Sequence, residues 1–189
     1  MKLIIFNILF FITGAIVAQE QIVPLTESSF FDEQDDVTYY YKDVNNDLNK
    51  FLGTWTFQDT NSELIVTFYF NEHHDLGGAF YDGLYAKFKY TENGAVIYDT
   101  LLDNSIAAEY HIFGGTIFQD TLNKTSLSYY EPTNIPYRGE WSPILYLELL
   151  PCNTIGCTPQ LKWDLYWAGG EDSDPWPFKI PSNMVLDKQ

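Results

Sequence analysis

Two runs decide the fold: Gly53-Thr54-Trp55-Thr56-Phe57-Gln58 and, after a polar turn, Glu63-Leu64-Ile65-Val66-Thr67-Phe68-Tyr69-Phe70. In both runs large apolar residues recur at every second position. Successive side chains of a β-strand point to opposite faces, so this period places the apolar ones on one face. The two runs therefore predict a β-hairpin with one fully apolar face.

The period of two continues in the next pair of strands. Leu84, Ala86, Phe88 and Tyr90 share a face, and Asn93-Gly94 marks the turn that follows. A two-residue turn would place Phe88 opposite Asp99. A three-residue loop with a bulge at Gly94 pairs Phe88 with Tyr98 and Lys87 with Asp99, which favours this second register because it joins apolar groups and opposite charges.

Further strands and one short helix complete the pattern. Glu148 and Lys162 are expected to face each other across the strongest late hairpin. Asp43 is expected to cap a helix that ends at Gly53. The predicted helix is 43–52, and the later strands are 112–119, 125–130, 144–150, 160–167 and a short closing strand at 184–186. About eight to nine strands with one short helix predict an all-β protein, an antiparallel β-barrel or, as the alternative, a β-sandwich.

The N-terminus has the plan of a secretory signal peptide. Lys2 precedes an apolar run from Leu3 to Val17, and the small residue Ala18 precedes polar residues. The run is shorter than the roughly 20 residues of a membrane-spanning helix. We therefore predict a signal peptide at 1–18, an acidic, aromatic N-terminal arm at 19–42 and a β-barrel domain at 43–189. The mature protein is expected in the periplasm or outside the cell, without a membrane span; a retained N-terminal anchor is the alternative.

The charge of the chain excludes some classes of partner. Its 189 residues include 10 basic and 26 acidic side chains, a net charge of −16. Phosphate backbones are bound by Lys and Arg, so nucleic acid is not an expected partner. The same charge disfavours anionic membrane surfaces.

Cys152 and Cys157 are the two cysteines of the chain. An exported chain folds in an oxidising compartment, so we predict a disulfide between them. In the chain-entropy account such a short ring contributes only about 2 kcal/mol of stability.

No pattern in the sequence indicates catalysis, a metal or a cofactor. In Glu72-His73-His74-Asp75, the neighbouring His side chains of a strand would point to opposite faces, so the cluster is interpreted as a solvated hairpin loop. The acidic loop at 171–174 lacks the spacing of a calcium loop. No nucleophile or phosphate-binding motif is present.

Two resemblances add to this interpretation. Phe51-Leu52-Gly53-Thr54-Trp55 resembles the start of the first strand in lipocalin-like barrels, where the Trp closes the barrel floor under a late Arg. Here Arg138 lies outside the last strong strand, so that cation is missing or replaced by a Lys. The chain also resembles small secreted bacterial proteins of unassigned function, at 42–46, at 160–163 and at its end, Pro181 to Lys188.

The lipocalin resemblance implies a binding protein. It predicts that inward-facing side chains hold a small apolar ligand: Trp55, Phe57, Phe68, Phe88, Tyr90 and Trp163. Ala86 and Gly114-Gly115 are small and would leave space for it. The alternative is a structural or interaction module of the cell surface, with a filled core and a protein partner. A secreted hydrolase is a third alternative.

Overall fold

The computed structural model describes residues 20–30, 34, 37–103, 105, 111–132, 143–168 and 176–189. The predicted signal peptide, Arg138 and the acidic loop at 171–174 lie outside these ranges. The strands are β1 (Gln21–Pro24), β2 (Tyr39–Lys42), β3 (Gly53–Gln58), β4 (Ser62–Asp75), β5 (Ala79–Glu92), β6 (Ala95–Asp99), β7 (Ile112–Phe118), β8 (Thr121–Tyr129), β9 (Ile144–Leu149), β10 (Gln160–Tyr166) and β11 (Asn183–Lys188). Two short 3₁₀ helices, η1 (Leu25–Phe30) and η2 (Asp47–Phe51), complete the described elements.

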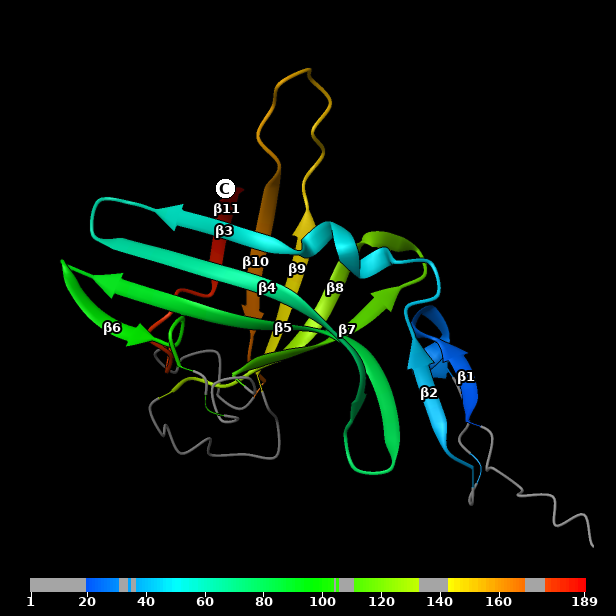
Figure 1. Ribbon diagram of the computed structural model, residues 1–189. Helices are drawn as coiled ribbons and strands as arrows, with labels where there is room; N and C mark the ends of the chain where they lie inside the picture. The colour runs from blue at the N-terminus through cyan, green and yellow to red at the C-terminus, as the bar shows by residue number, and fades with distance from the viewer. Residues whose placement is uncertain are drawn as a thin grey trace, which may run out of the picture.

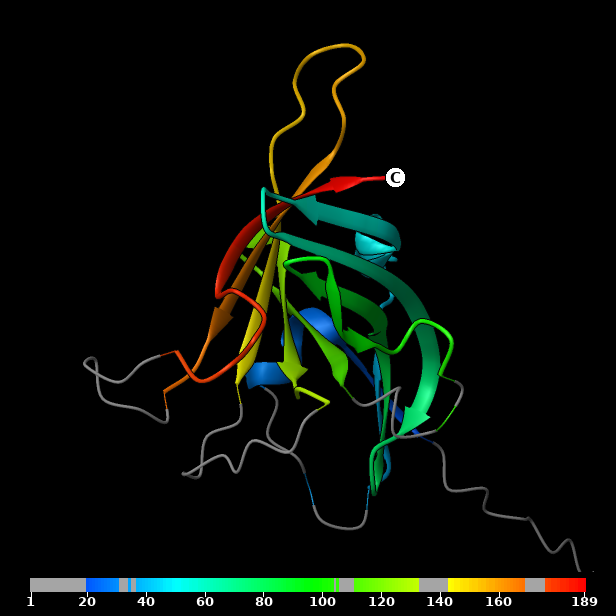
Figure 2. The ribbon, with the colours of Figure 1, turned by 90° about the vertical axis from the view of Figure 1, so that its left-hand side faces the viewer.

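Eight of the strands form a closed antiparallel barrel. They pair in the order β5, β4, β3, β11, β10, β9, β8 and β7, and β7 pairs back with β5. Figures 1 and 2 show these strands curling around a common interior. The predicted all-β, lipocalin-like barrel is therefore confirmed, and the β-sandwich alternative does not apply.

Strand β5 joins the barrel to the N-terminal arm. One of its edges pairs with β4. The other edge has three partners in succession: β2 along Ala79–Tyr81, β7 along Leu84–Ala86 and β6 along Lys89–Glu92. Strands β1 and β2 run parallel to this first part of β5 and lie at one side of the barrel (Figure 1). Residues 21–24 and 39–42 of the predicted arm thus belong to the sheet.

The predicted helix is present in a shorter form. The Asp43 carboxylate accepts hydrogen bonds from the main-chain N–H groups of Asp47 and Leu48, both at 2.8 Å, so Asp43 caps the segment as expected. The helical residues, however, are only those of η2, and they form a 3₁₀ helix. The chain needs the preceding residues for the turn out of β2, where Asn46 has a left-handed conformation with φ of 58°.

The predicted register of the β5–β6 hairpin was wrong. Glu92 pairs with Ala95, so the turn is the two-residue Asn93-Gly94. The bulge lies farther down the ladder, after Tyr90, and brings Tyr90 opposite Tyr98 and Lys89 opposite Asp99. This arrangement still joins apolar groups and opposite charges, with a Lys89–Asp99 ion pair at 3.9 Å. The preferences for apolar and oppositely charged cross-strand pairs did not indicate that the bulge would lie at Ile97. The predicted pair Glu148–Lys162 between β9 and β10 is confirmed.

The barrel interior is packed with alternating side chains of its strands. The interior residues that are at most 3% exposed include Trp55, Leu64, Val66, Phe68, Leu84, Ala86, Phe88, Tyr90, Ile112, Ile117, Leu127, Tyr129, Leu145, Leu147, Leu161, Trp163, Leu165, Met184 and Leu186. Many of these are aromatic, and an eight-stranded barrel is just wide enough for side chains to fill it. These side chains form one continuous hydrophobic core.

Trp55 lies at the junction where β3 meets β11. Its indole Nε1 donates a hydrogen bond to the Phe51 carbonyl, at 2.8 Å, and its side chain is fully buried. Lys188 pairs with Trp55 across the strands, and its Nζ lies 5.0 Å from the centre of the indole ring. A cation over an indole is attracted by the ring's negative face. A Lys thus lies over the indole ring of Trp55.

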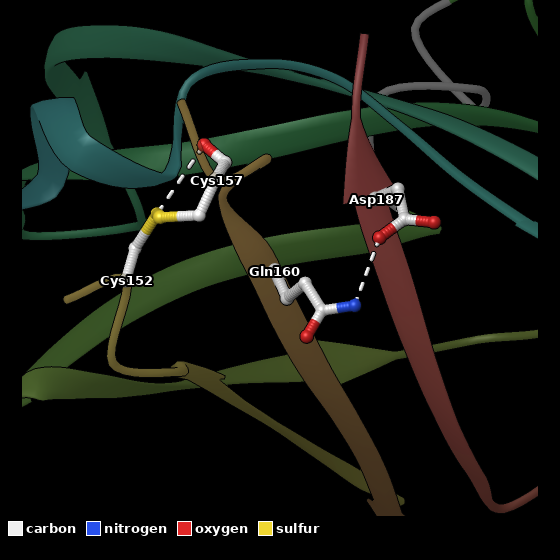
Figure 3. The surroundings of a disulfide bond; sticks show 4 residues. All are labelled: Cys152, Cys157, Gln160 and Asp187. Carbon is white, nitrogen blue, oxygen red and sulfur yellow. Dashed lines mark hydrogen bonds between the residues drawn. A yellow bond between two sulfur atoms is a disulfide. The ribbon is translucent and has the colours of Figure 1, made fainter. Parts of the chain in front are cut away.

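The loop between β9 and β10 projects beyond the barrel (Figures 1 and 2). The predicted disulfide between Cys152 and Cys157 crosses it, with the two Cα atoms 6.0 Å apart. Figure 3 shows the bridge near the start of β10, where the Gln160 amide donates a hydrogen bond to Asp187 of β11 at 3.0 Å. The bridge constrains the loop rather than the core. Ile155, in this loop, is fully exposed.

We expect Lys188 and Trp55 to be energetically coupled. In a double-mutant cycle with Lys188→Met and Trp55→Phe, the free energies of unfolding, measured by chemical denaturation, should show a coupling of about 0.5–1 kcal/mol. Lys188→Met combined with Trp163→Phe is the control, and those two effects should add. Additivity of the first pair would contradict the contact over the indole ring.

Candidate functional site

The residues predicted to bind a ligand inside the barrel lie in the core. Trp55, Phe68, Phe88, Tyr90 and Trp163 are each at most 2% exposed, whereas Phe57 is half-buried and packs against them. The structure therefore brings the predicted residues together. None of them lines either of the two cavities on the outer wall that are described below. Their role in ligand binding stays a prediction.

Trp163 has one unusual feature within this core. Its indole ring meets the ring of Tyr129 edge to face, with centroids 6.2 Å apart. Its Nε1 is buried and has no hydrogen-bond acceptor among the described residues. Leaving a buried donor unsatisfied costs about 1–3 kcal/mol. An acceptor atom of a bound molecule beside Nε1 would remove this cost.

A buried carboxylate fixes the segment that precedes β11. Glu131 accepts hydrogen bonds from the hydroxyls of Tyr98 and Tyr129, at 3.0 and 3.1 Å. It also accepts the main-chain N–H groups of Lys179 and Ile180, at 2.7 and 3.1 Å. Glu131 thus accepts hydrogen bonds from four donors and holds Ile180 in the core, which indicates a structural role.

A cavity of about 200 Å³ lies on the outer wall of the barrel, where the N-terminal arm meets it. We name it the outer cleft. It is lined by Leu25, Leu76, Tyr81, Asp82, Gly83, Tyr85, Phe113, Gly114, Gly115, Thr116 and Ser128. These residues come from η1, from the β4–β5 turn and from strands β5, β7 and β8.

Strand register places the cleft outside the barrel. Tyr85 pairs with Phe113, Phe113 with Ser128, Ser128 with Ile144, and Ile144 with Tyr166. Directly paired residues project from the same face of a sheet. Ile144 and Tyr166 are 37% and 55% exposed, so this row faces outward. The aromatic walls of the cleft are therefore separate from the packed core.

Glycines allow the segments around the cleft to approach closely. A Cβ on Gly115 would lie 3.1 Å from a methyl carbon of Leu48 in η2, so this helix packs directly on the backbone of β7. A Cβ on Gly83 would lie 3.0 Å from the Gly114 carbonyl oxygen. Gly114 itself has φ of 128°, which L side chains rarely adopt. Part of the cleft wall is thus bare backbone.

A second, more open hollow of about 400 Å³ adjoins the outer cleft and shares two residues with it, Leu76 and Tyr81. We name it the side hollow. Its lining residues are Tyr39, Leu76, Gly77, Gly78, Ala79 and Tyr81. The Tyr81 ring is stacked on Tyr41, with centroids 4.6 Å apart and planes within 14°. Together the two spaces run along the contact between the arm and the β4–β5 hairpin.

Asp82 holds the arm against the barrel. One carboxylate oxygen accepts the Tyr40 hydroxyl at 2.6 Å and the His73 N–H at 3.0 Å. The other oxygen accepts the N–H of Asp43 at 2.9 Å. Asp82 thereby ties β2 and the residue after it to the bulge in β4, which lies between Asn71 and His74. The side chain is 3% exposed, so water does not compete for these bonds.

The surroundings of Tyr40 hold it in its neutral form. Burial, the hydrogen bond to Asp82 and the nearby negative charges together raise the pKa of Tyr40 far above its usual value. The His73 ring stands edge-on to Tyr40, stacks on Phe80 and lies with its Nε2 2.8 Å from a Glu20 carboxylate oxygen. Glu20 precedes β1, so the start of the arm is fixed at the same junction.

Sequence reasoning did not find the outer cleft. Its walls come from segments far apart in the chain, and the arm was interpreted as a separate acidic segment. The available signals were Gly114-Gly115, already expected to leave space, and the run Tyr39 to Tyr41. All three of these tyrosines are buried in the structure.

A metal site is absent from the described part of the chain. Among its residues, no group of three or more His, Cys, Asp or Glu side chains is placed to hold an ion. His73 and His74, which the sequence analysis assigned to a loop, belong to the end of β4, where His73 has φ of 54°. In the same part of the chain, no helix has both the length and the apolar character needed to cross a membrane.

Comparison with known proteins places the chain in a family. The family described as "Family of unknown function (DUF6705)" matches residues 1–189. The chain belongs to this family. No curated protein and no solved structure matches it significantly. Family membership therefore does not indicate an activity. The functional proposal rests on the geometry of the barrel and of the outer cleft.

We expect the Tyr40 phenol to stay protonated well above pH 10. Because its pKa is raised in the folded state, its contribution to stability is complete below the unfolded pKa of about 10 and is lost as pH rises toward the folded pKa. The phenolate absorbance of wild type minus Tyr40→Phe should show one group titrating above the ordinary tyrosines. A difference curve centred near pH 10 would contradict the buried bond to Asp82.

Proposed function

We propose that this barrel is a binding protein for a small, mostly apolar ligand, and that the ligand occupies the outer cleft. The observation that carries the proposal is the cleft itself, whose walls are the rings of Tyr81, Tyr85 and Phe113 with Leu25 and Leu76. Binding sites for small molecules are concave, mostly apolar and equipped with a few polar groups. Thr116 and Ser128 supply the polar groups here.

The volume of the cleft sets the size of the ligand. An apolar cavity of about 150 Å³ in another protein is large enough to bind benzene. The outer cleft has about 200 Å³ and opens toward the side hollow. We therefore infer a ligand with a single ring or a branched chain of similar size, while any longer part of it extends into the side hollow.

The interior of the barrel is the second candidate site. The unsatisfied Nε1 of Trp163 supports it, because a ligand with a hydrogen-bond acceptor would complete that donor. Against it stand the large, fully buried side chains that pack around Trp163, Tyr129 among them. A ligand there would have to displace packed aromatic rings, so we prefer the outer cleft.

Calorimetric titration with p-cresol tests the proposal. The wild-type protein should bind it with a dissociation constant on the order of 0.1–1 mM, as expected for a ligand of this size. Ser128→Leu fills the cleft from the outer face of β8 and should weaken binding at least tenfold. Ser126→Leu is the matched control, because Ser126 points outward on the same strand two residues away and does not line the cleft.

The outcomes separate the candidate sites. Binding that survives Ser128→Leu but is lost in Trp163→Phe would move the ligand into the barrel interior. Absence of saturable binding in the wild type would remove both ligand sites. The barrel would then be a structural or interaction module of the cell surface, for which the projecting loop with fully exposed Ile155 is a suitable contact.

We also propose that the protein is exported, with a signal peptide at 1–18, the N-terminal arm at 19–42 and the barrel domain at 43–189. The charged and apolar pattern from Lys2 to Val17 supports this division, and the Cys152–Cys157 disulfide suits an oxidising compartment. N-terminal sequencing of the exported protein should begin at Gln19. Membrane-embedded protein that retains Met1 would contradict cleavage.

A further inference from the structure

We propose that the ligand of the outer cleft is an uncharged hydrogen-bond donor, such as a phenol or a neutral amine, whose O–H or N–H binds the main-chain carbonyl oxygen of Asp82. This inference rests on the proposed function and names the chemical class of its ligand. Its starting point is a break in the pairing of β5 that lies in the wall of the cleft.

Asp82 contributes its main chain to the cleft, and its carboxylate points elsewhere. Neighbouring side chains of a strand point to opposite faces, and Tyr81 lines the cleft, so the Asp82 side chain lies on the other face of the sheet. There its two carboxylate oxygens accept the hydrogen bonds of Tyr40, Asp43 and His73. The part of Asp82 that lines the cleft is therefore its peptide group.

The bonds of β5 show toward which edge the Asp82 carbonyl points. Thr100, which follows β6, donates its N–H to the Phe88 carbonyl at 2.8 Å, and its Oγ1 accepts the Phe88 N–H at 2.8 Å. The main-chain groups of a strand point to alternate edges from one residue to the next. The N–H and C=O groups of Ala86, Leu84 and Asp82 therefore point to this same edge, away from β4.

Neither neighbouring ladder provides a donor for the Asp82 carbonyl at that edge. The pairing of β2 with β5 ends at Tyr81, and the pairing of β7 with β5 begins at Leu84, opposite Gly114. If the parallel ladder of β2 continued, its next donor would be the N–H of Asp43. This N–H binds the Asp82 carboxylate instead, at 2.9 Å. The carbonyl thus lies in the gap between two ladders.

Burial makes it costly to leave this carbonyl without a donor. Asp82 is 3% exposed, and Gly83 beside it is also buried. Buried main-chain groups are almost always hydrogen-bonded, to protein, to ordered water or to a ligand. A carbonyl oxygen accepts hydrogen bonds and does not donate them, so the group that complements it is an O–H or an N–H.

The other polar groups of the cleft do not make this selection. The hydroxyls of Thr116 and Ser128 can both donate and accept, so they suit a ligand of either kind. The described residues that line the cleft include no Lys, Arg or His, and the carboxylate of Asp82 lies on the other face. A charged ligand would lose its hydration without meeting an opposite charge, which favours an uncharged donor.

Three compounds of similar size test the inference: p-cresol, p-toluidine and 4-fluorotoluene. The first two carry a neutral donor where the third carries fluorine. In calorimetric titrations at neutral pH, both donors should bind about fivefold more tightly than 4-fluorotoluene, as expected for one hydrogen bond to a buried acceptor. A cleft that only buries apolar surface would prefer 4-fluorotoluene, the most apolar of the three, and that order would overturn the inference.

A double variant tests whether the hydroxyls produce the preference. Thr116→Val combined with Ser128→Ala removes both hydroxyls without filling the cleft. The affinities themselves should change, but the ratio of p-cresol to 4-fluorotoluene affinity should stay above about threefold, because the carbonyl is still present. A ratio near one would assign the preference to the hydroxyls and contradict the role of Asp82.

The carbonyl itself gives a readout that needs no substitution. In the wild-type protein, p-cresol should move the carbonyl ¹³C resonance of Asp82 downfield in a saturable way, whereas 4-fluorotoluene should not. The carbonyl of Ala86 is the matched control, because it points to the same edge of β5 but lies within the ladder with β7. An unmoved Asp82 resonance in protein saturated with p-cresol would overturn the inference.

The two proposals fail in distinguishable ways. If 4-fluorotoluene binds as tightly as p-cresol and Ser128→Leu weakens the binding of both, the cleft binds apolar ligands without selecting a donor, and only this inference is wrong. If none of the three compounds binds to the wild-type protein, the proposed function is wrong as well.

Discussion

The carboxylate of Asp82 is the group on which the arrangement of the outer wall depends. It receives hydrogen bonds from β2, from the residue after β2 and from the bulged end of β4, and Asp82 itself is buried. Hydrogen bonds to a charged group are worth about 1.5–3 kcal/mol each, so their loss would weaken the attachment of the arm. The arm supplies Leu25 to the outer cleft and Tyr39 to the side hollow. Asp82 therefore helps to keep both spaces in place, together with the pairing of β2 with β5.

The packing of the interior is the reason why we place the proposed binding surface outside the barrel. The interior is occupied by large rings, among them Trp55 and Trp163, and the segment before β11 is anchored by Glu131. An eight-stranded barrel filled in this way has little space left. The edge of β5, by contrast, is longer than its barrel partner β7, and the part that extends past it pairs with the arm. The space between the arm and the wall is the outer cleft.

Much of the barrel could be predicted from the sequence, because local patterns fix its parts. The period of two located the strands, Asp43 was identified as a helix cap, and Glu148 was correctly placed opposite Lys162. The sequence did not indicate which cation, if any, would lie over Trp55, and the structure places Lys188 there. Bulges were harder to predict, since an extra residue such as the one near Ile97 leaves no clear signal.

The candidate site could not be predicted in the same way. Leu25, Tyr85 and Phe113 are separated by long stretches of chain. The pairing of β5 with β7 brings Tyr85 and Phe113 together, and the pairing of β2 with β5 places the arm, with Leu25, beside them. Asp82 is one of 26 acidic residues, and nothing in its local sequence marks it as buried. The parallel pairing of the acidic, aromatic arm with the edge of β5 joins residues that are far apart in the chain. Local periodicity in a sequence gives no information about such a pairing.

The most direct test of the central claim is an amide-resolved NMR titration of the folded protein with p-cresol. The account predicts that the resonances of Gly83, Gly114 and Gly115 in the cleft wall shift in a saturable way. The indole N–H of Trp163 should stay unchanged in the same spectra, because it lies in the packed interior. A shifted Trp163 indole resonance with unchanged cleft glycines would place the ligand inside the barrel and contradict the account.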